Sequence, residues 1–292
     1  VVNTLADTVD ADVDTTSLRE ALLGANASAG ADTINFSVAG AINVATSLPN
    51  LTDTSGGTTI DAATAPGYAG TPVVSLVGPG FSINGLEIHS AHNTVRGLQI
   101  GNFNNGITLA RASAANNTVE NCFIGVNAAG TGAVPNGAAG VLIAAGAFNN
   151  QIGSFDALER NVIAGNLGDG ILITGPATFP NYVNNNAIGA NLTGTLDLGN
   201  AGNGITVTDG AKNVQVAQNV IAFNDGDGVR LTSTAGNGVQ ITSNSFFDNG
   251  RLGINLVSAT DNAAGVTPND PLDADSGPNN LTNAPVITKV VG

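Results

Sequence analysis

A glycine followed by an aliphatic residue recurs between residues 106 and 254, and this repeat limits the possible folds more than any other feature. The steps between successive copies are 34, 30, 34, 24 and 25 residues. A period that falls to about 24 and grows only by insertion is typical of a solenoid, in which each turn of the chain stacks on the one before. The copies are Gly106-Ile107, Gly140-Val141, Gly170-Ile171, Gly204-Ile205, Gly228-Val229 and Gly253-Ile254.

Within each repeat a branched or aliphatic residue is followed by another five positions later, and the chain then turns at Asn or Gly. Helical repeats of similar period are the competing interpretation. These repeats contain Asn, Gly, Val, Ile and Thr where helices would favour Ala, Leu, Glu and Lys. We therefore predict an all-β fold, a right-handed single-stranded parallel β-helix with three sides. The spaced pairs include Val95 and Ile100, Val119 and Ile124, Val183 and Ile188, and Val216 and Ile221.

The asparagines at the bends have a predicted role of their own. Coils of a parallel β-helix stack about 4.8 Å apart, so that equivalent residues lie above one another. Stacked asparagine side chains can then form hydrogen-bonded ladders that also satisfy the backbone of the turns. We expect glycine at bends where the backbone is left-handed.

One short helix is predicted near the N-terminus, from Ser17 to Ala25. Ser17 and Glu20 match a capping box, in which each side chain accepts a hydrogen bond from the other residue's backbone. The apolar face of this helix would cover the open strand edges of the first coil. A helix packed beside the solenoid is the alternative. The apolar face consists of Leu18, Ala21, Leu22 and Ala25.

The N-terminal region resembles a known family. The segment from Ser17 to Leu22, followed by Asn26, residues 30–34 and Phe36, is similar to the "CSLREA" region that precedes β-helix repeats in large exported surface proteins of bacteria and archaea. Thr16 stands where the cysteine of that motif usually stands. The resemblance continues through residues 253–256, 267–270, 273–280 and 284–287. It implies the β-helix architecture and says almost nothing about activity.

We interpret the chain as one elongated domain, because a solenoid uses length linearly. Residues 1–32 would form the N-terminal strand and capping helix, residues 33–258 the coils, and residues 259–292 an acidic loop and a C-terminal strand. Between residues 33 and 90 we expect less regular strands, with residues 62–72 as an excursion from the coils.

Two insertions match at a constant offset of 64 residues. They run from Ile124 to Gly137 and from Ile188 to Ala201, and each has Gly-Thr in the middle of the loop. Alternate coils would therefore project the same loop from the same side. Whether these loops bind a glycan, a surface or another subunit, or only record a duplication, is left open.

Charge and composition exclude some classes of function. The formal net charge is −14, from 8 basic and 22 acidic residues, which repels polyanions such as nucleic acid and favours cations or neutral glycans. No apolar run approaches the ~20 residues of a membrane-spanning helix. The first residues are predicted to form a strand, and the missing initiator Met favours a removed targeting segment. We expect an extracellular or cell-surface location.

Exported β-helices include polysaccharide lyases and hydrolases, so catalytic residues were sought. A hydrolase needs two carboxyl groups about 5–10 Å apart. Asp225 and Asp227 beside Arg230, with Asp169 below them, are the best candidates. Each of these aspartates precedes or lies in an Asn/Asp-Gly bend, which favours a structural role in the turn. No catalytic residue is assigned.

A lyase for uronates needs a base and cations near the substrate carboxylates. The five arginines between residues 96 and 251 fall in different parts of their coils, and no basic cleft is predicted. His89 and His92 share one loop without a third ligand at metal-binding spacing, so a solvated turn is favoured. Cys122 lies in a predicted strand, where a buried apolar role is expected.

An acidic segment near the C-terminus is the one predicted metal site. Asp270, Asp273 and Asp275 precede a glycine, as in oxygen-rich loops that bind calcium. The segment lacks the full twelve-residue EF-hand pattern. Calcium is therefore the possible cofactor, and no other is predicted; the alternative is an acidic surface loop.

Residues 284–292 form a predicted apolar strand with no capping helix after it. An uncovered strand invites pairing with another chain, so we hypothesise head-to-tail self-association into a filament. The sequence as a whole favours an exported, non-catalytic surface role as an adhesin stalk, envelope component or filament subunit, by self-association or contact with surfaces and glycans. A carbohydrate-active enzyme or glycan-binding module is the alternative. Most phenylalanines are expected inside, and Tyr68 and Tyr182 are the natural platforms for a sugar.

Overall fold

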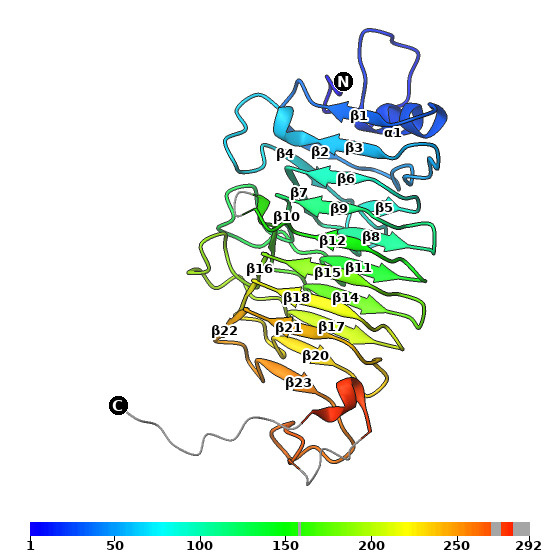
Figure 1. Ribbon diagram of the computed structural model, residues 1–292. Coiled ribbons are helices and arrows are strands. Elements are labelled where there is room, and N and C mark those ends of the chain that lie inside the picture. Colours follow the sequence, from blue (N-terminus) through cyan, green and yellow to red (C-terminus); the bar gives the residue numbers. More distant parts are fainter. Residues whose placement is uncertain (157–158, 270–275, 283–292) are drawn as a thin grey trace.

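The computed structural model describes residues 1–156, 159–269 and 276–282. The chain forms a three-sided right-handed parallel β-helix, as predicted. Successive strands pass to the next side of the helix, except that the first coil contributes only the isolated bridge of Leu51 with Ile88 to the third side. All pairings between the named strands of the described residues are parallel. The three sheets therefore run side by side along one elongated solenoid (Figure 1).

Each sheet collects the equivalent strand of every coil. Sheet 1 contains β1 (Asp32–Asn35), β3 (Thr58–Asp61), β6 (Thr94–Arg96), β9 (Thr118–Glu120), β12 (Asn150–Ile152), β15 (Asn181–Asn184), β18 (Val214–Ala217) and β21 (Gln240–Thr242). Sheet 2 contains β2 (Gly40–Asn43), β4 (Val74–Val77), β7 (Leu98–Gly101), β10 (Phe123–Ile124), β13 (Val162–Ile163), β16 (Ala187–Ile188), β19 (Val220–Ala222) and β22 (Ser245–Phe247). Sheet 3 contains β5 (Leu86–Ile88), β8 (Ile107–Ala110), β11 (Val141–Ala144), β14 (Ile171–Thr174), β17 (Ile205–Thr208), β20 (Val229–Leu231) and β23 (Ile254–Leu256).

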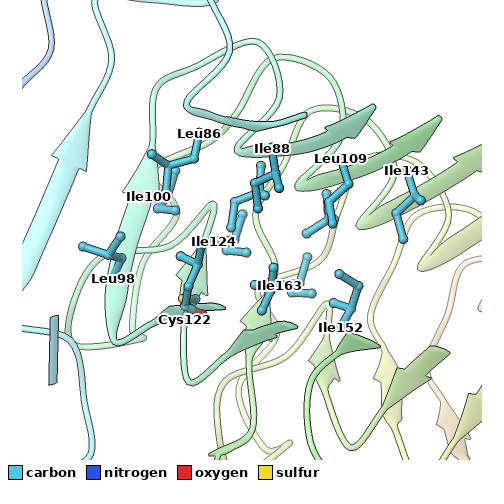
Figure 2. Close-up of a cluster of buried hydrophobic side chains, with 14 of the residues drawn as sticks. Leu86, Ile88, Leu98, Ile100, Leu109, Cys122, Ile124, Ile143, Ile152 and Ile163 are labelled. Atoms are coloured by element: carbon cyan, nitrogen blue, oxygen red, sulfur yellow. The ribbon is translucent and has the colours of Figure 1, made fainter. Parts of the chain in front are cut away.

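The core is a narrow column of aliphatic side chains between the three sheets. Successive coils place equivalent residues in register, as in the row of Ile88, Leu109 and Ile143 in sheet 3. Figure 2 shows this stacking, with Cys122 among the aliphatic side chains. Cys122 is fully buried, and burial raises the pKa of its thiol to about 12. The predicted role of Cys122 as a buried apolar residue is therefore confirmed, and its thiol is not placed to act as a nucleophile.

Asparagine ladders stabilise each of the three bends, as the repeat predicted. In each ladder the side-chain amide of one asparagine donates to the side-chain oxygen of the equivalent asparagine in the next coil, over 2.8–3.1 Å. Because all but the terminal Asn244 and Asn249 are buried, these amides satisfy each other and the adjacent backbone away from water. The ladders are Asn93–Asn117–Asn150–Asn181 before sheet 1, Asn161–Asn186–Asn219–Asn244 before sheet 2, and Asn136–Asn166–Asn200–Asn224–Asn249 before sheet 3.

The N-terminal helix α1 (Leu18–Ala27) lies at the first coil, beside β1 (Figure 1). Its capping box is present, with the Glu20 backbone N–H donating to Ser17 and the Ser17 backbone N–H donating to Glu20. Leu18 and Leu22 are fully buried and belong to the same core as the coils. The predicted helix was thus correct, and it extends two residues beyond Ala25. Within the described part of the chain, no helix is long and apolar enough to cross a bilayer.

The two matched insertions adopt the same conformation. Each closes through an antiparallel bridge, Val126 with Ala133 and Ala190 with Asp197. In each loop the first asparagine accepts from the backbone of the Gly-Thr threonine, at 3.0 and 2.8 Å. The loops leave β10 and β16, which lie two coils apart, so alternate coils project the same loop as predicted.

Candidate functional site

The aspartates that were weighed as hydrolase candidates are turn residues. The Asp227 carboxylate is fully buried and accepts from Arg230 Nη1 (2.9 Å), Asn255 Nδ2 (2.8 Å) and the Leu252 backbone N–H (3.0 Å). Asp169 accepts from the Asn203 backbone N–H at 2.7 Å. Their oxygens bind the bends of neighbouring coils, so the structural interpretation holds for both.

The histidines and acidic residues do not form a metal site in the described residues. His89 lies 3.2 Å from Glu87, and burial lowers its pKa, while His92 is exposed. Among the residues that the structure describes, no group of three His, Cys, Asp or Glu side chains is placed to hold a metal ion. The predicted calcium ligands Asp270, Asp273 and Asp275 and the predicted C-terminal strand, residues 284–292, lie outside the described residues. Calcium and strand donation therefore stay predictions.

A cleft of about 720 Å³ opens where sheet 1 meets sheet 2. Its floor is formed by Arg96 at the end of β6 and Asn121 just after β9. Described residues of three loops from different coils form its walls: residues 65–73, residues 153–156 with 159–161, and residues 189–199. The first of these is the predicted excursion, and it follows the short 3₁₀ helix η1 (Ala62–Thr64). We call this site the Tyr68 cleft; it is lined by Tyr68, Arg96, Asn121, Asp156, Glu159, Arg160, Asn185 and Leu192, and by residues 69–71.

Arg160 is the unneutralised cation of the Tyr68 cleft. Its guanidinium donates to the Asn185 side-chain oxygen (3.3 Å) and to the Leu192 backbone carbonyl (3.2 Å), which are both neutral. No carboxylate lies within 4 Å of it among the described residues. Burial lowers its pKa, which shows that the charge is partly removed from water. A half-buried guanidinium without an anionic partner is a binding group for an anion.

Arg96 occupies a row of charged side chains along sheet 1. The pairing of β3, β6 and β9 places Asp61, Arg96 and Glu120 side by side, at the strand spacing of about 4.8 Å. Arg96 Nε lies 3.4 Å from Asp61 Oδ1. Two acidic residues line the cleft itself, Asp156 and Glu159, and Glu159 accepts a hydrogen bond of 2.7 Å from the Ser154 hydroxyl. Arg96 is thus compensated by the protein, whereas Arg160 is not.

Tyr68 presents a buried hydroxyl to this site. The hydroxyl oxygen makes no hydrogen bond of ordinary geometry among the described residues, although the Asn121 side chain lies near enough to lower the pKa of Tyr68 slightly. Burial raises the pKa of Tyr68, against the opposing effect of Arg96. The hydroxyl therefore stays protonated at neutral pH and is free to donate to a ligand, since an unpaired buried polar group is costly.

Glu120 has an unfavourable environment for its charge. Burial is the main cause that raises its pKa, and the carboxylate of Glu159 raises it further, against the effect of Arg96. We expect Glu120→Gln to stabilise the protein at neutral pH by about 0.5 kcal/mol, because the group is only half-buried and partly screened by solvent. Urea unfolding at a series of pH values measures the difference.

The pH dependence of this effect has a defined sign. Since the folded state binds the Glu120 proton more tightly than the unfolded chain does, the penalty is absent below the ordinary glutamate pKa of about 4.3 and complete above the raised folded pKa. The advantage of Glu120→Gln should therefore grow as pH rises through this interval. Asp225→Asn, at an exposed carboxylate, is the control and should show no such growth. A constant difference between pH 4 and pH 8 would contradict the assignment.

The sequence predicted no basic cleft, and the Tyr68 cleft combines two arginines with the carboxylates of Asp156 and Glu159. Arg96 and Arg160 meet there because the loop between β12 and β13 contacts Asn121 and Asn185 at the bends of other coils, which the spacing of the arginines does not reveal. The phenylalanines were also partly misassigned. Phe123 is buried, but Phe223 and Phe247 are only half-buried at a bend, where their rings meet edge to face at 5.4 Å. Exposed phenylalanines include Phe81, Phe148 and Phe155.

Comparison with solved structures finds other parallel β-helix proteins. The chain is similar to the A-modules of two Azotobacter vinelandii mannuronan C-5 epimerases. For AlgE6 the TM-score is 0.38 at 16% identity, over 83% of this chain and 75% of that chain. For AlgE4 it is 0.39 at 15% identity, over 85% and 78%. For ORF18 of Geobacillus virus E2 it is 0.35 at 11% identity, over 79% and 53%.

Neither a family model nor a curated protein matches this sequence. The similarity to CSLREA-type proteins therefore rests on the residues quoted above. At these identities and TM-scores, the likeness to solved structures carries no argument about activity. The parallel β-helix itself is established by the register of the chain's own strands.

Proposed function

We propose that this protein binds an acidic polysaccharide in the Tyr68 cleft. The observation that carries the proposal is the half-buried Arg160 guanidinium, which has neutral partners only, in the same cleft as an unpaired tyrosine hydroxyl. A guanidinium fork matches the geometry of a carboxylate, and a tyrosine ring presents an apolar face with a polar edge to a sugar. The ligand class is a polymer of uronic acids or similarly anionic sugars.

The size and construction of the cleft support a carbohydrate ligand. A volume of about 720 Å³ lies within the usual range for small-molecule sites. Its walls are loops held on a rigid stack of coils, an arrangement that places binding groups reproducibly. Arg160 itself bridges the wall loops, because it contacts the loop after β16 and the end of β15. This proposal follows the alternative that the sequence left open, a glycan-binding module.

The test is binding of polygalacturonate and alginate, compared with neutral dextran, by isothermal titration calorimetry. Arg160→Gln should weaken binding of the polyuronate at least about tenfold, since a charge-assisted pair is lost. Tyr68→Phe keeps the ring and removes the hydroxyl, and should weaken binding less. Arg111→Gln changes the net charge equally at an exposed arginine outside the cleft and should leave binding unchanged. Equal binding by wild type and Arg160→Gln, or no binding of either polyuronate, would refute the proposal.

An exported scaffold or filament role is the second candidate, and the last strands of the solenoid favour it. Among the described residues β21, β22 and β23 each end their sheet, and Ile254 in β23 is 44% exposed beside an apolar hollow of about 300 Å³. At the other end α1 covers the first coil, so a head-to-tail contact would meet the outer face of this helix. Electron microscopy of the purified chain decides between filaments and single particles.

A further inference from the structure

An uncharged row of polar side chains runs along the outer face of sheet 1. Strand register joins one outward residue from each of its eight strands into a continuous line. All eight are at least partly exposed. We call this line the polar row; it consists of Thr33, Thr59, Thr94, Thr118, Gln151, Tyr182, Gln215 and Gln240.

The hydrogen-bonding groups of the polar row are unused by the protein. Within the described residues, no hydrogen bond is formed by the hydroxyl or amide group of any of its eight side chains. Seven strand spacings of about 4.8 Å give the row a length of ~34 Å. It therefore offers hydroxyl and amide groups at a regular interval, over the length of an oligosaccharide instead of a single sugar.

The polar row passes directly beside the Tyr68 cleft. Thr94 and Arg96 are both outward residues of β6, and Thr118 and Glu120 are both outward residues of β9. Each pair is two residues apart, so the row passes roughly 7 Å from the charged floor of the cleft. Tyr182, the second tyrosine that the sequence singled out as a sugar platform, lies in the row three strands beyond Thr94.

Charge selects the ligand that fits this surface. The protein carries a net charge of −14, which repels a polyanion from most of its surface. The polar row contains no carboxylate. Asp61 and Glu120 flank Arg96 in the strand register, and Asp156 and Glu159 line the cleft together with Arg160. An acidic chain with many hydroxyl groups would therefore meet no carboxylate along the row, and would meet the two arginines where the row passes the cleft.

We infer that the polar row is an extended binding surface for the same acidic polysaccharide, which lies along the solenoid axis with one anionic sugar in the Tyr68 cleft. This inference rests on the proposed function of the cleft. It adds that the protein recognises the interior of a long chain and gains affinity with each further sugar on the row.

The test uses oligogalacturonides of defined length and isothermal titration calorimetry. Wild type should bind the decasaccharide at least about tenfold more tightly than the disaccharide, a difference of about 1.4 kcal/mol. The double variant Gln151→Glu/Gln215→Glu, which adds carboxylates to the row, should lose most of this gain and bind the disaccharide normally. Tyr182→Ala should reduce the gain without adding charge. Gln218→Glu makes the same substitution at an exposed glutamine around the bend and should retain the gain.

The possible outcomes distinguish the polar-row proposal from the cleft proposal. If wild type binds the disaccharide but gains nothing with length, or if both row variants retain the gain, the polar row is refuted and the cleft stands. If Arg160→Gln abolishes binding at every length while the row variants affect only long chains, both proposals are supported. If wild type binds no oligogalacturonide, the cleft proposal fails and the row proposal fails with it.

Discussion

Replacing Asn200 by alanine should lower the free energy of unfolding by about 3 kcal/mol, because several buried hydrogen bonds are lost together. Asn200 is fully buried in the middle of its ladder. Its side-chain oxygen accepts from the Asn166 backbone N–H (3.1 Å) and side-chain amide (2.9 Å). Its own amide donates to Asn224 Oδ1 (2.8 Å) and to the Ile163 carbonyl (3.1 Å). Among the described residues, the substitution removes the only hydrogen-bond partner of the buried Asn166 backbone N–H and of Asn224 Oδ1, whereas the Ile163 carbonyl and the Asn166 amide keep other hydrogen bonds.

Urea unfolding followed by circular dichroism measures this effect. Asn127→Ala is the matched control, because the Asn127 side chain bonds only within its own insertion loop. Its cost should stay below about 1 kcal/mol, as for a partly exposed hydrogen bond. Equal costs at the two positions would show that the ladder contributes no more than a local turn does.

Asp227→Ala should cost about 3–5 kcal/mol, the usual penalty when one member of a buried ion pair is removed. The carboxylate holds Arg230, Asn255 and the backbone N–H of Leu252, so it joins the last two coils of sheet 3. Without it, a guanidinium and two other donors lose their acceptor. The thermal unfolding midpoint should fall accordingly.

Asp225→Ala is the control for this prediction. Asp225 lies two residues earlier in the same bend, and its carboxylate is exposed. Its removal should change stability by less than about 0.5 kcal/mol, as for most surface substitutions. A small effect of Asp227→Ala would contradict this structural role, and the catalytic role considered from the sequence would then have to be tested.

Much of the fold was predictable because it depends on local pattern and repetition. The five-residue spacing from Val216 to Ile221 places one residue in sheet 1 and the other in sheet 2, with the bend between them. The ladders follow from asparagines at equivalent bends, and the helix cap follows from Ser17 and Glu20 alone. Because similar coils stack on one another, residues that recur at the same position of each repeat lie side by side in the fold.

The Tyr68 cleft was not predictable in the same way, although one signal pointed to it. Asp61, Arg96 and Glu120 each follow an inward aliphatic residue of sheet 1, so an alignment of the repeats by that residue places them in one row. The position of Arg160 has no such signal. It lies in the loop between β12 and β13, and its place in the cleft depends on contacts with Asn185 and Leu192 from later coils.

By itself the sequence determined the three-sided parallel β-helix, its capping helix and the ladders at its bends, because each depends on residues that recur at a fixed place in the coil or lie within one turn of helix. The tertiary structure decided which loops meet. Tyr68, Arg96 and Arg160 come from different coils at unequal spacing, and they share a cleft only because the coils stack in register and the inserted loops contact one another at the same bend. Irregular insertions have no period to extrapolate. The scaffold therefore follows from the sequence pattern, whereas the residues of the proposed binding cleft are brought together only by tertiary packing.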